Sequence, residues 1–253
     1  MKRDSSPERK RDGLFLKSDG FGVGEVVIET PVHNKTIATM ETFEVERIIR
    51  AYRRRYLKLI KTEEINLVTI FRNYGPLAGT SLEHPHSQII ATPIIPPHVR
   101  DPINKVRDSF DSYGTCVYCD VLKEELRQRE RVILETDFFA VISPFAARSP
   151  FETRIIPKEH RASFGDISDR EVIDLAEVLR QTMKKIYVGL NDPNYNYIIR
   201  SAPYGDEEAR YLHWYIVIIP KLTTPAGFEI SSGIYINVSL PEQCAEFLRN
   251  VDV

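Results

Sequence analysis

The chain of 253 residues is long enough for one large domain or two modest ones, and its composition, 42% apolar and 28% charged, is that of a globular protein. Its formal net charge of −2 argues against a nucleic-acid-binding surface, which usually carries a basic excess. No apolar stretch is long enough to span a membrane, and no secretory signal follows the charged N-terminus, so we expect a cytoplasmic protein.

The first half of the chain alternates strand and helix patterns around two histidines. A predicted strand over 23–30 is followed by His33, and apolar residues then recur with helical period over 44–61. An apolar, β-rich run over 65–71 and a glycine-containing loop come next. His84 then leads into a further apolar strand.

The second half repeats this order. A predicted strand over 151–157 precedes His160, a helical pattern covers 169–187, and a strand over 195–200 precedes His213, which opens another apolar strand. The two histidines are 53 residues apart, against 51 residues in the first half. A repeat at this spacing indicates a duplicated structural unit.

The repeat predicts an α+β protein made of two halves, 1–97 and 98–253, with mainly antiparallel sheets and packed helices. Residues 96–113 link the halves. After the repeat, 227–237 is predicted as a further strand and 241–251 as a short helix with proline at its start.

One position breaks the repeat. His86 stands two residues after His84, whereas Tyr215 stands two residues after His213. Such a difference favours chemistry in the first half only.

The strand that follows His84 is expected to present a polar face. Residues two apart share a face, so His84, His86 and Gln88 line one surface and Ser87 points the other way. Pro85 cannot donate to a sheet ladder, so the strand begins there or lies at an edge. Buried, hydrogen-bonded structural histidines are the alternative, but two imidazoles beside an amide favour a reactive site.

The run His84-Pro85-His86-Ser87-Gln88 resembles the signature of the galactose-1-phosphate uridylyltransferase family, a branch of the histidine-triad superfamily. Further collinear matches are Pro31–Thr36, Phe71–Gly75, Pro150–Thr153, Pro157–His160, His213-Trp214 and Gly227–Glu229. The resemblance implies two histidine-triad-like halves and an enzyme that moves UMP between UDP-glucose and a hexose 1-phosphate (galactose 1-phosphate) by ping-pong kinetics.

The resemblance also implies roles for single residues. His86 corresponds to the nucleophile, Gln88 and Ser81 to residues that hold the phosphoryl oxygens, and Asn73 to a further phosphate contact. Phe228 and Glu229 match the part that recognises the hexose, in the family often across a dimer interface, which implies a homodimer.

Two other functions stay open. The stretch 227–237 also resembles plant-type adenylyl-transferring phosphorylases, so an ADP-sugar phosphorylase or adenylyltransferase is one alternative. A non-catalytic, zinc-stabilised nucleotide-sugar binding protein is the other.

The cysteines suggest a metal site in the second half. Cys116 and Cys119 form a CxxC pair, and His160 and His213 can complete a closed tetrahedral set for a structural zinc. A redox pair or ordinary core thiols are the alternatives. The third cysteine, Cys244, is expected to be a small apolar residue.

In the first half, His33 and His84 occupy the equivalent positions, and the resemblance implies that they too are zinc ligands. The second-half spacing would place their cysteine partners before residue 1, so we expect that the chain lacks the family's N-terminal segment. One firm zinc and, at most, a weak second site at His33 and His84 are therefore expected.

Overall fold

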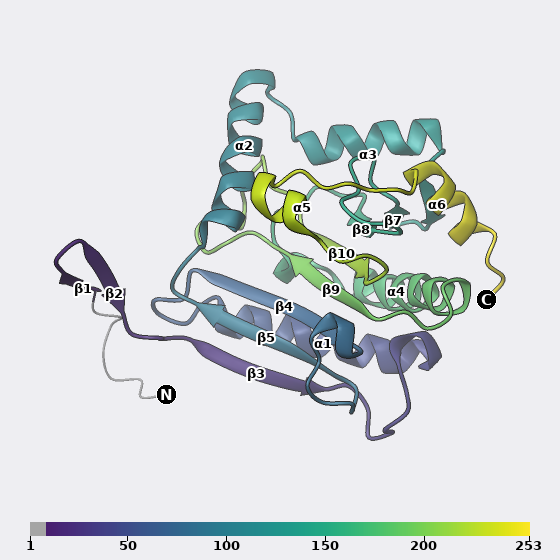
Figure 1. Ribbon diagram of the computed structural model, residues 1–253, viewed down its shortest axis with the longest axis horizontal. Coiled ribbons are helices and arrows are strands. Elements are labelled where there is room, and N and C mark those ends of the chain that lie inside the picture. The colour runs from purple at the N-terminus through teal and green to yellow at the C-terminus, as the bar shows by residue number, and fades with distance from the viewer. Residues whose placement is uncertain (1–8) are drawn as a thin grey trace.

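The computed structural model describes residues 9–253, which form one large antiparallel sheet covered by helices, with a small hairpin to one side (Figure 1). The hairpin pairs β1 (Arg9–Asp12) with β2 (Phe15–Ser18). In spatial order the large sheet consists of β3 (Val23–Ile28), β5 (His86–Thr92), β4 (Leu67–Tyr74), β9 (Tyr195–Arg200), β10 (Tyr215–Pro220), β8 (Thr153–Pro157), β7 (Phe139–Ile142) and β6 (Val132–Glu135).

The strand order confirms the predicted duplication. The order β3-β5-β4 in the first half is mirrored by β8-β10-β9 in the second, and every neighbouring pair is antiparallel. The two halves share one continuous sheet, because β4 pairs directly with β9. This central pairing satisfies the backbone groups that would otherwise form two open sheet edges.

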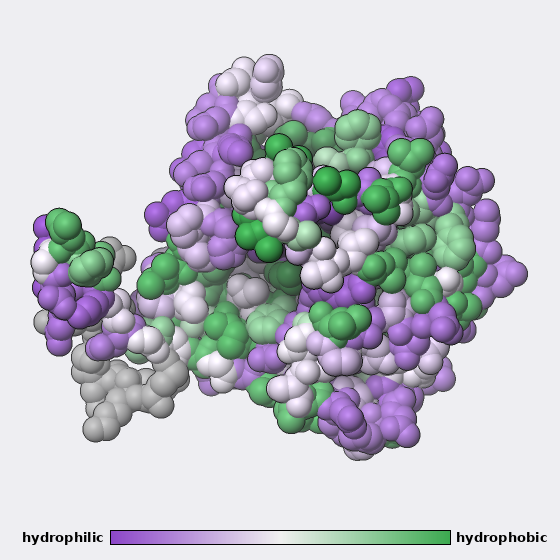
Figure 2. All heavy atoms as spheres, viewed as in Figure 1, coloured by the Kyte–Doolittle hydropathy of each residue, from purple (hydrophilic) through white to green (hydrophobic). Residues whose placement is uncertain are grey.

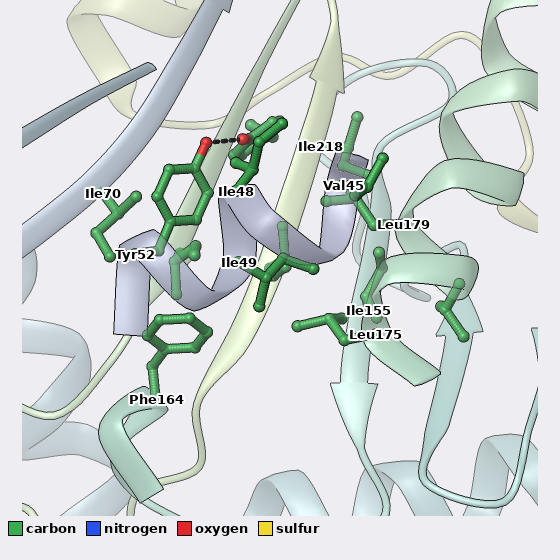
Figure 3. Close-up of a cluster of buried hydrophobic side chains, with 14 of the residues drawn as sticks. Val45, Ile48, Ile49, Tyr52, Ile70, Ile155, Phe164, Leu175, Leu179 and Ile218 are labelled. Atoms are coloured by element: carbon green, nitrogen blue, oxygen red, sulfur yellow. Dashed lines mark hydrogen bonds between the residues drawn. The ribbon is translucent and has the colours of Figure 1, made fainter. Parts of the chain in front are cut away.

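Two helices cover one face of the sheet, as the periodic patterns predict. They are α1 (Thr42–Leu59) and α4 (Asp169–Gly189), and their apolar faces meet strand residues such as Ile70 and Ile218 in the main core (Figure 3). Each fully buried aliphatic side chain of this kind contributes about 1.5–3 kcal/mol. A capping box fixes the start of α4: the Ser168 hydroxyl accepts from the Glu171 N–H, and the Glu171 carboxylate accepts from the Ser168 N–H.

The other face is covered only in part. Leu122 of α3 (Val117–Gln128) packs against the β6, β7 and β8 side of the sheet. Ile103 of α2 (Pro97–Tyr113) packs beside Ala162 and Leu212, so the predicted link between the halves is helical. The space-filling view shows this face hollowed near its middle (Figure 2). We call it the open face.

Short helices complete the fold. Single 3-10 turns occur at η1 (Ile37–Thr39), η2 (Pro76–Ala78) and η3 (Phe164–Asp166). The last helices are α5 (Gly227–Ser232) and α6 (Pro241–Arg249), and α6 begins with proline as predicted. In residues 9–253, none of the helices is both long and apolar enough to cross a membrane.

The prediction of a strand over 227–237 is wrong. The segment forms α5 and then continues without regular structure to α6. Local interactions explain the helix: the Glu229 carboxylate accepts from the Ala226 N–H at its start, and Gly233 ends it with a φ of 70°, a left-handed conformation.

Candidate active site and metal centre

The strand β5 begins at His86, directly after the proline that cannot join a ladder. The His86 side chain is 6% exposed, and its Nδ1 lies 2.8 Å from the carbonyl oxygen of His84. Because a carbonyl can only accept, Nδ1 carries the proton when the ring is neutral. The lone pair of the neutral imidazole is therefore on Nε2.

Alternation along β5 separates the polar face from the core, as predicted. Ser87 and Ile89 are fully buried, whereas Gln88 is half-buried and Ile90 is 36% exposed. The Ser87 hydroxyl accepts from the Tyr52 hydroxyl of α1 at 2.5 Å. Burial raises the pKa of Tyr52, so this phenol stays a neutral donor under the strand.

A buried ion pair that no sequence pattern predicted lies beneath the start of β5. Arg72 Nε lies 2.9 Å from Glu29 Oε2, and both side chains are almost fully buried. The Glu29 N–H donates to the Pro85 carbonyl at 3.1 Å, which ties the pair to the residue before His86. The feature of the sequence that could have indicated this pair is the presence of Glu29 and Arg72 within otherwise apolar strand patterns.

Two predicted phosphate-binding residues lie on the open face near His86. Gln88 is in register with Phe71 of β4, and Asn73 follows two residues later, so both amides belong to one face of adjacent strands. Asn196 of β9 donates from Nδ2 to Asn73 Oδ1 at 2.8 Å. Among residues 9–253, the Asn73 Nδ2 group donates no hydrogen bond, so it can serve a ligand.

The other predicted substrate residues lie outside the strands. Ser81 is exposed in the loop between η2 and β5. Phe228 is 52% exposed on α5. The pKa of Glu229 on the same helix is lowered by backbone N–H groups of Glu229 itself and Ala226. The structure thus groups His86, Gln88 and Asn73 on one sheet face, whereas Phe228 and Glu229 lie on a separate element, α5.

The structure brings the predicted metal ligands together. The donor atoms of Cys116, Cys119, His160 and His213 all lie within 4.8 Å of one another. Cys119 Sγ is 3.3 Å from His160 Nδ1 and 3.4 Å from His213 Nδ1. In a tetrahedral zinc site the ligand atoms are about 3.5 Å apart. The four residues therefore fit a zinc ion.

Two local features prepare these side chains for a metal. His213 donates from Nε2 to the Pro157 carbonyl at 2.9 Å, which leaves Nδ1 with its lone pair toward the thiols. Cys116 is the N-cap of α3 and Cys119 lies in its first turn. Hydrogen bonding from Cys119 lowers the pKa of the Cys116 thiol, and the same contact raises the pKa of Cys119, so Cys116 is the thiol that ionises first.

The first-half histidines repeat half of this arrangement. His84 donates from Nε2 to the Thr30 carbonyl at 2.8 Å, and its Nδ1 lies 3.2 Å from His33 Nδ1. The ring centroids are 5.4 Å apart in this pair and in the His160–His213 pair. Within residues 9–253, the Cys116 set is the only cluster of three or more possible metal ligands with converging atoms.

Comparison with known proteins gives matches over both halves. The family model for the N-terminal domain of galactose-1-phosphate uridyl transferase matches residues 1–96, and the model for its C-terminal domain matches residues 103–252. ADP-glucose phosphorylase from Arabidopsis thaliana is 38% identical over 236 residues, and the chain spans only 66% of that protein's length. Galactose-1-phosphate uridylyltransferase from Thermotoga maritima is 32% identical, with 100% of this chain and 82% of that protein covered.

Solved structures agree with these matches. The crystal structure of an ADP-glucose phosphorylase from Arabidopsis thaliana with bound ADP-glucose superposes with a TM-score of 0.87 at 36% identity, covering 94% of this chain and 76% of the other. A uridylyltransferase structure gives a TM-score of 0.89 at 27% identity, covering 97% and 80%.

Proposed function

The chain belongs to the galactose-1-phosphate uridylyltransferase family, and on that premise we propose that it is a nucleotidyltransferase that moves UMP between UDP-glucose and galactose 1-phosphate. The observation that carries this proposal is the orientation of His86. Its Nδ1–H donates to the His84 carbonyl, and Nε2 keeps a lone pair on the strand face that also presents Gln88.

The reaction proceeds in two displacements on phosphorus. His86 Nε2 attacks the α-phosphorus of UDP-glucose, an N–P bond forms, and the P–O bond to glucose 1-phosphate breaks with the electron pair going to the leaving oxygen. The leaving group is a phosphate monoester whose second pKa is about 6, so it departs without a general acid. A phosphate oxygen of galactose 1-phosphate then attacks the same phosphorus, and the N–P bond breaks to restore neutral imidazole.

The surrounding residues stabilise charge during these steps. The ring gains positive charge when Nε2 forms its bond, and the Nδ1–H hydrogen bond to the His84 carbonyl strengthens at that moment. The amides of Gln88 and Asn73, with the Ser81 hydroxyl, donate to the non-bridging phosphoryl oxygens. Such donors do not compete with the imidazole as nucleophiles.

Hexose recognition is proposed for Phe228 and Glu229 in a homodimer. The segment that carries them exposes several apolar side chains, including Ile230 at 77% and Val238 at 81%. Exposed apolar residues gathered in one segment are typical of a surface that another chain covers. Sedimentation analysis checks this point, with a dimer expected.

We further propose that Cys116, Cys119, His160 and His213 hold a structural zinc. A bound ion would link the start of α3, which carries both cysteines, to the segment after β8 and the segment before β10, which carry the two histidines. No step of the transfer reaction depends on it. His33 and His84 offer at most a weak second site.

A second candidate function is phosphorolysis or adenylyl transfer on an ADP-sugar. The similarity to ADP-glucose phosphorylase, at 38% identity over 236 residues, favours it. The same nucleophile and amide donors would serve either nucleotide, since they contact phosphate rather than the base.

Isotope exchange separates these functions. Labelled glucose 1-phosphate is incubated with UDP-glucose or with ADP-glucose, and the label is followed into the nucleotide sugar. Exchange with UDP-glucose supports the uridylyltransferase, and exchange with ADP-glucose alone supports the second candidate. Binding of nucleotide sugar without any exchange would contradict both and favour a binding protein.

A further inference from the structure

The second half contains a cavity of about 300 Å³ that the proposed reaction does not use. It lies on the open face, with walls from β8, β9, β10 and the start of α2. Its polar and aromatic lining includes His98, Tyr118, Arg148, Arg154, Arg200 and Tyr215. Because Tyr215 is the repeat equivalent of His86, this cavity occupies the second-half counterpart of the candidate active site.

The cavity has an excess of positive charge. Its one acidic lining residue, Glu152, is already engaged: it accepts from Arg154 Nη2 at 3.0 Å and from the Arg148 backbone N–H at 2.9 Å. Within residues 9–253, neither the Arg148 nor the Arg200 guanidinium forms an ion pair with a carboxylate. Two arginines without a carboxylate partner therefore line a space large enough for a small molecule, and the Arg148 guanidinium also packs on the Tyr235 ring, 5.4 Å from its centroid.

The remaining walls favour a phosphorylated ligand. Guanidinium groups bind phosphate oxygens in paired hydrogen bonds. The first turn of α2 supplies His98 and Val99, so the positive end of a 17-residue helix lies at the same wall. The rings of Tyr118 and Tyr215, with centroids 5.7 Å apart, offer an apolar surface beside the charge.

We propose that this cavity is a second ligand site, which binds a small phosphorylated molecule without reacting with it. The first half presents an imidazole lone pair at the equivalent position, whereas the second half presents the Tyr215 ring beneath the Arg154 guanidinium, whose central carbon lies 5.3 Å from the ring centroid. The duplicated scaffold thus keeps an anion-binding surface in both halves but a nucleophile in only one.

The test is a titration of the full chain with inorganic phosphate, glucose 1-phosphate and ADP, followed by hydrogen–deuterium exchange. We expect at least one of the three to protect peptides that cover 98–103 and 200–202. Arg200→Gln should weaken that binding about tenfold or more, as expected for loss of a charge-assisted contact. Arg170→Gln, at an exposed arginine on α4 outside the cavity, is the matched control and should bind as the wild type does.

Two further measurements separate this site from the proposed reaction. Arg200→Gln should keep the isotope exchange rate within a fewfold of wild type, and Arg148→Gln repeats the test if Arg200→Gln does not fold. Protection by all three probes only near residues 71–90, or unchanged binding in both arginine variants, would overturn the proposal. Loss of exchange together with binding, at an unchanged unfolding temperature, would place the cavity in the reaction site and also overturn it.

Discussion

At the scale of single residues, His84, His86 and His213 each donate one ring N–H to a backbone carbonyl. That bond decides which of the two ring nitrogens keeps its lone pair. His84 and His213 donate from Nε2 to backbone carbonyls and keep Nδ1 free, toward the paired histidine and the thiols respectively. His86 donates from Nδ1 instead and keeps Nε2 free. The same side chain thereby leaves Nδ1 available at two positions, where we propose metal binding, and Nε2 at the third, where we propose attack on phosphorus.

We predict that replacing His86 removes transfer while preserving the fold. His86→Asn keeps a donor near the His84 carbonyl but has no nucleophilic nitrogen, so the exchange rate should fall at least about 10³-fold. The unfolding temperature should stay close to that of the wild type. Near-normal exchange in this variant would exclude His86 as the nucleophile.

For Gln88 we predict a loss of turnover rather than of affinity. Gln88→Met has similar volume but no amide donor, and losing one donor to transition-state charge costs about 10²- to 10³-fold in kcat. KM should change only a fewfold. Steady-state kinetics check this, and a raised KM at normal kcat would instead indicate a role in ground-state binding.

At the scale of elements, the periodic sequence patterns predicted the helices and strand faces that depend on local interactions. The helix patterns at 44–61 and 169–187 match α1 and α4, because each has one continuous buried face. Alternation also predicted that Ser87 faces away from Gln88. The pattern failed at 227–237, where an N-terminal carboxylate cap and a left-handed Gly233 outweigh the strand-like composition.

These patterns could not predict contacts between residues that are far apart in the sequence. The Glu29–Arg72 pair joins residues 43 apart, and the lining of the second-half cavity comes from separate segments between 98 and 219. No local period relates such residues. The Cys116 cluster could be predicted because thiols and imidazoles are few and because the repeat placed both histidines.

The Glu29–Arg72 pair leads to a prediction about stability. Arg72→Met leaves a buried carboxylate without its partner and should lower the free energy of unfolding by about 3–5 kcal/mol. Removing both charges, with Glu29→Gln added, should recover part of this loss. Arg127→Met, in an exposed pair with Glu124, is the control and should cost less than about 1 kcal/mol. Urea denaturation measures all three, and equal costs for the two arginine variants would contradict the buried-pair interpretation.

At the scale of the whole molecule, duplication has produced one sheet with unequal halves. The mirrored strand order shows that both halves keep the same strand arrangement. His86 and Tyr215 occupy equivalent positions in it but differ in chemistry. The metal-type cluster lies in the second half, and His86, the proposed nucleophile, lies in the first. Metal binding and catalysis are thus expected to be separable.

We therefore predict one tightly held zinc per chain. Cys119→Ser should lose the metal and lower the unfolding temperature, whereas Cys244→Ala removes a buried thiol of α6 and should keep the zinc. Elemental analysis of dialysed protein measures the content. Two zinc ions per chain would show that His33 and His84 also bind firmly, and none would make Cys116 and Cys119 ordinary buried thiols.

Covalent transfer through His86 is tested most directly by denaturing the full chain during turnover of UDP-glucose labelled in the uridylyl phosphate, with labelled ADP-glucose in parallel. We expect the label on the peptide that contains His86, in an acid-labile and base-stable bond typical of a phosphorus–imidazole linkage. His86→Asn should retain no label. Label on another residue, or measurable exchange in a wild-type chain that never becomes labelled, would contradict a nucleotidyl-histidine intermediate at His86.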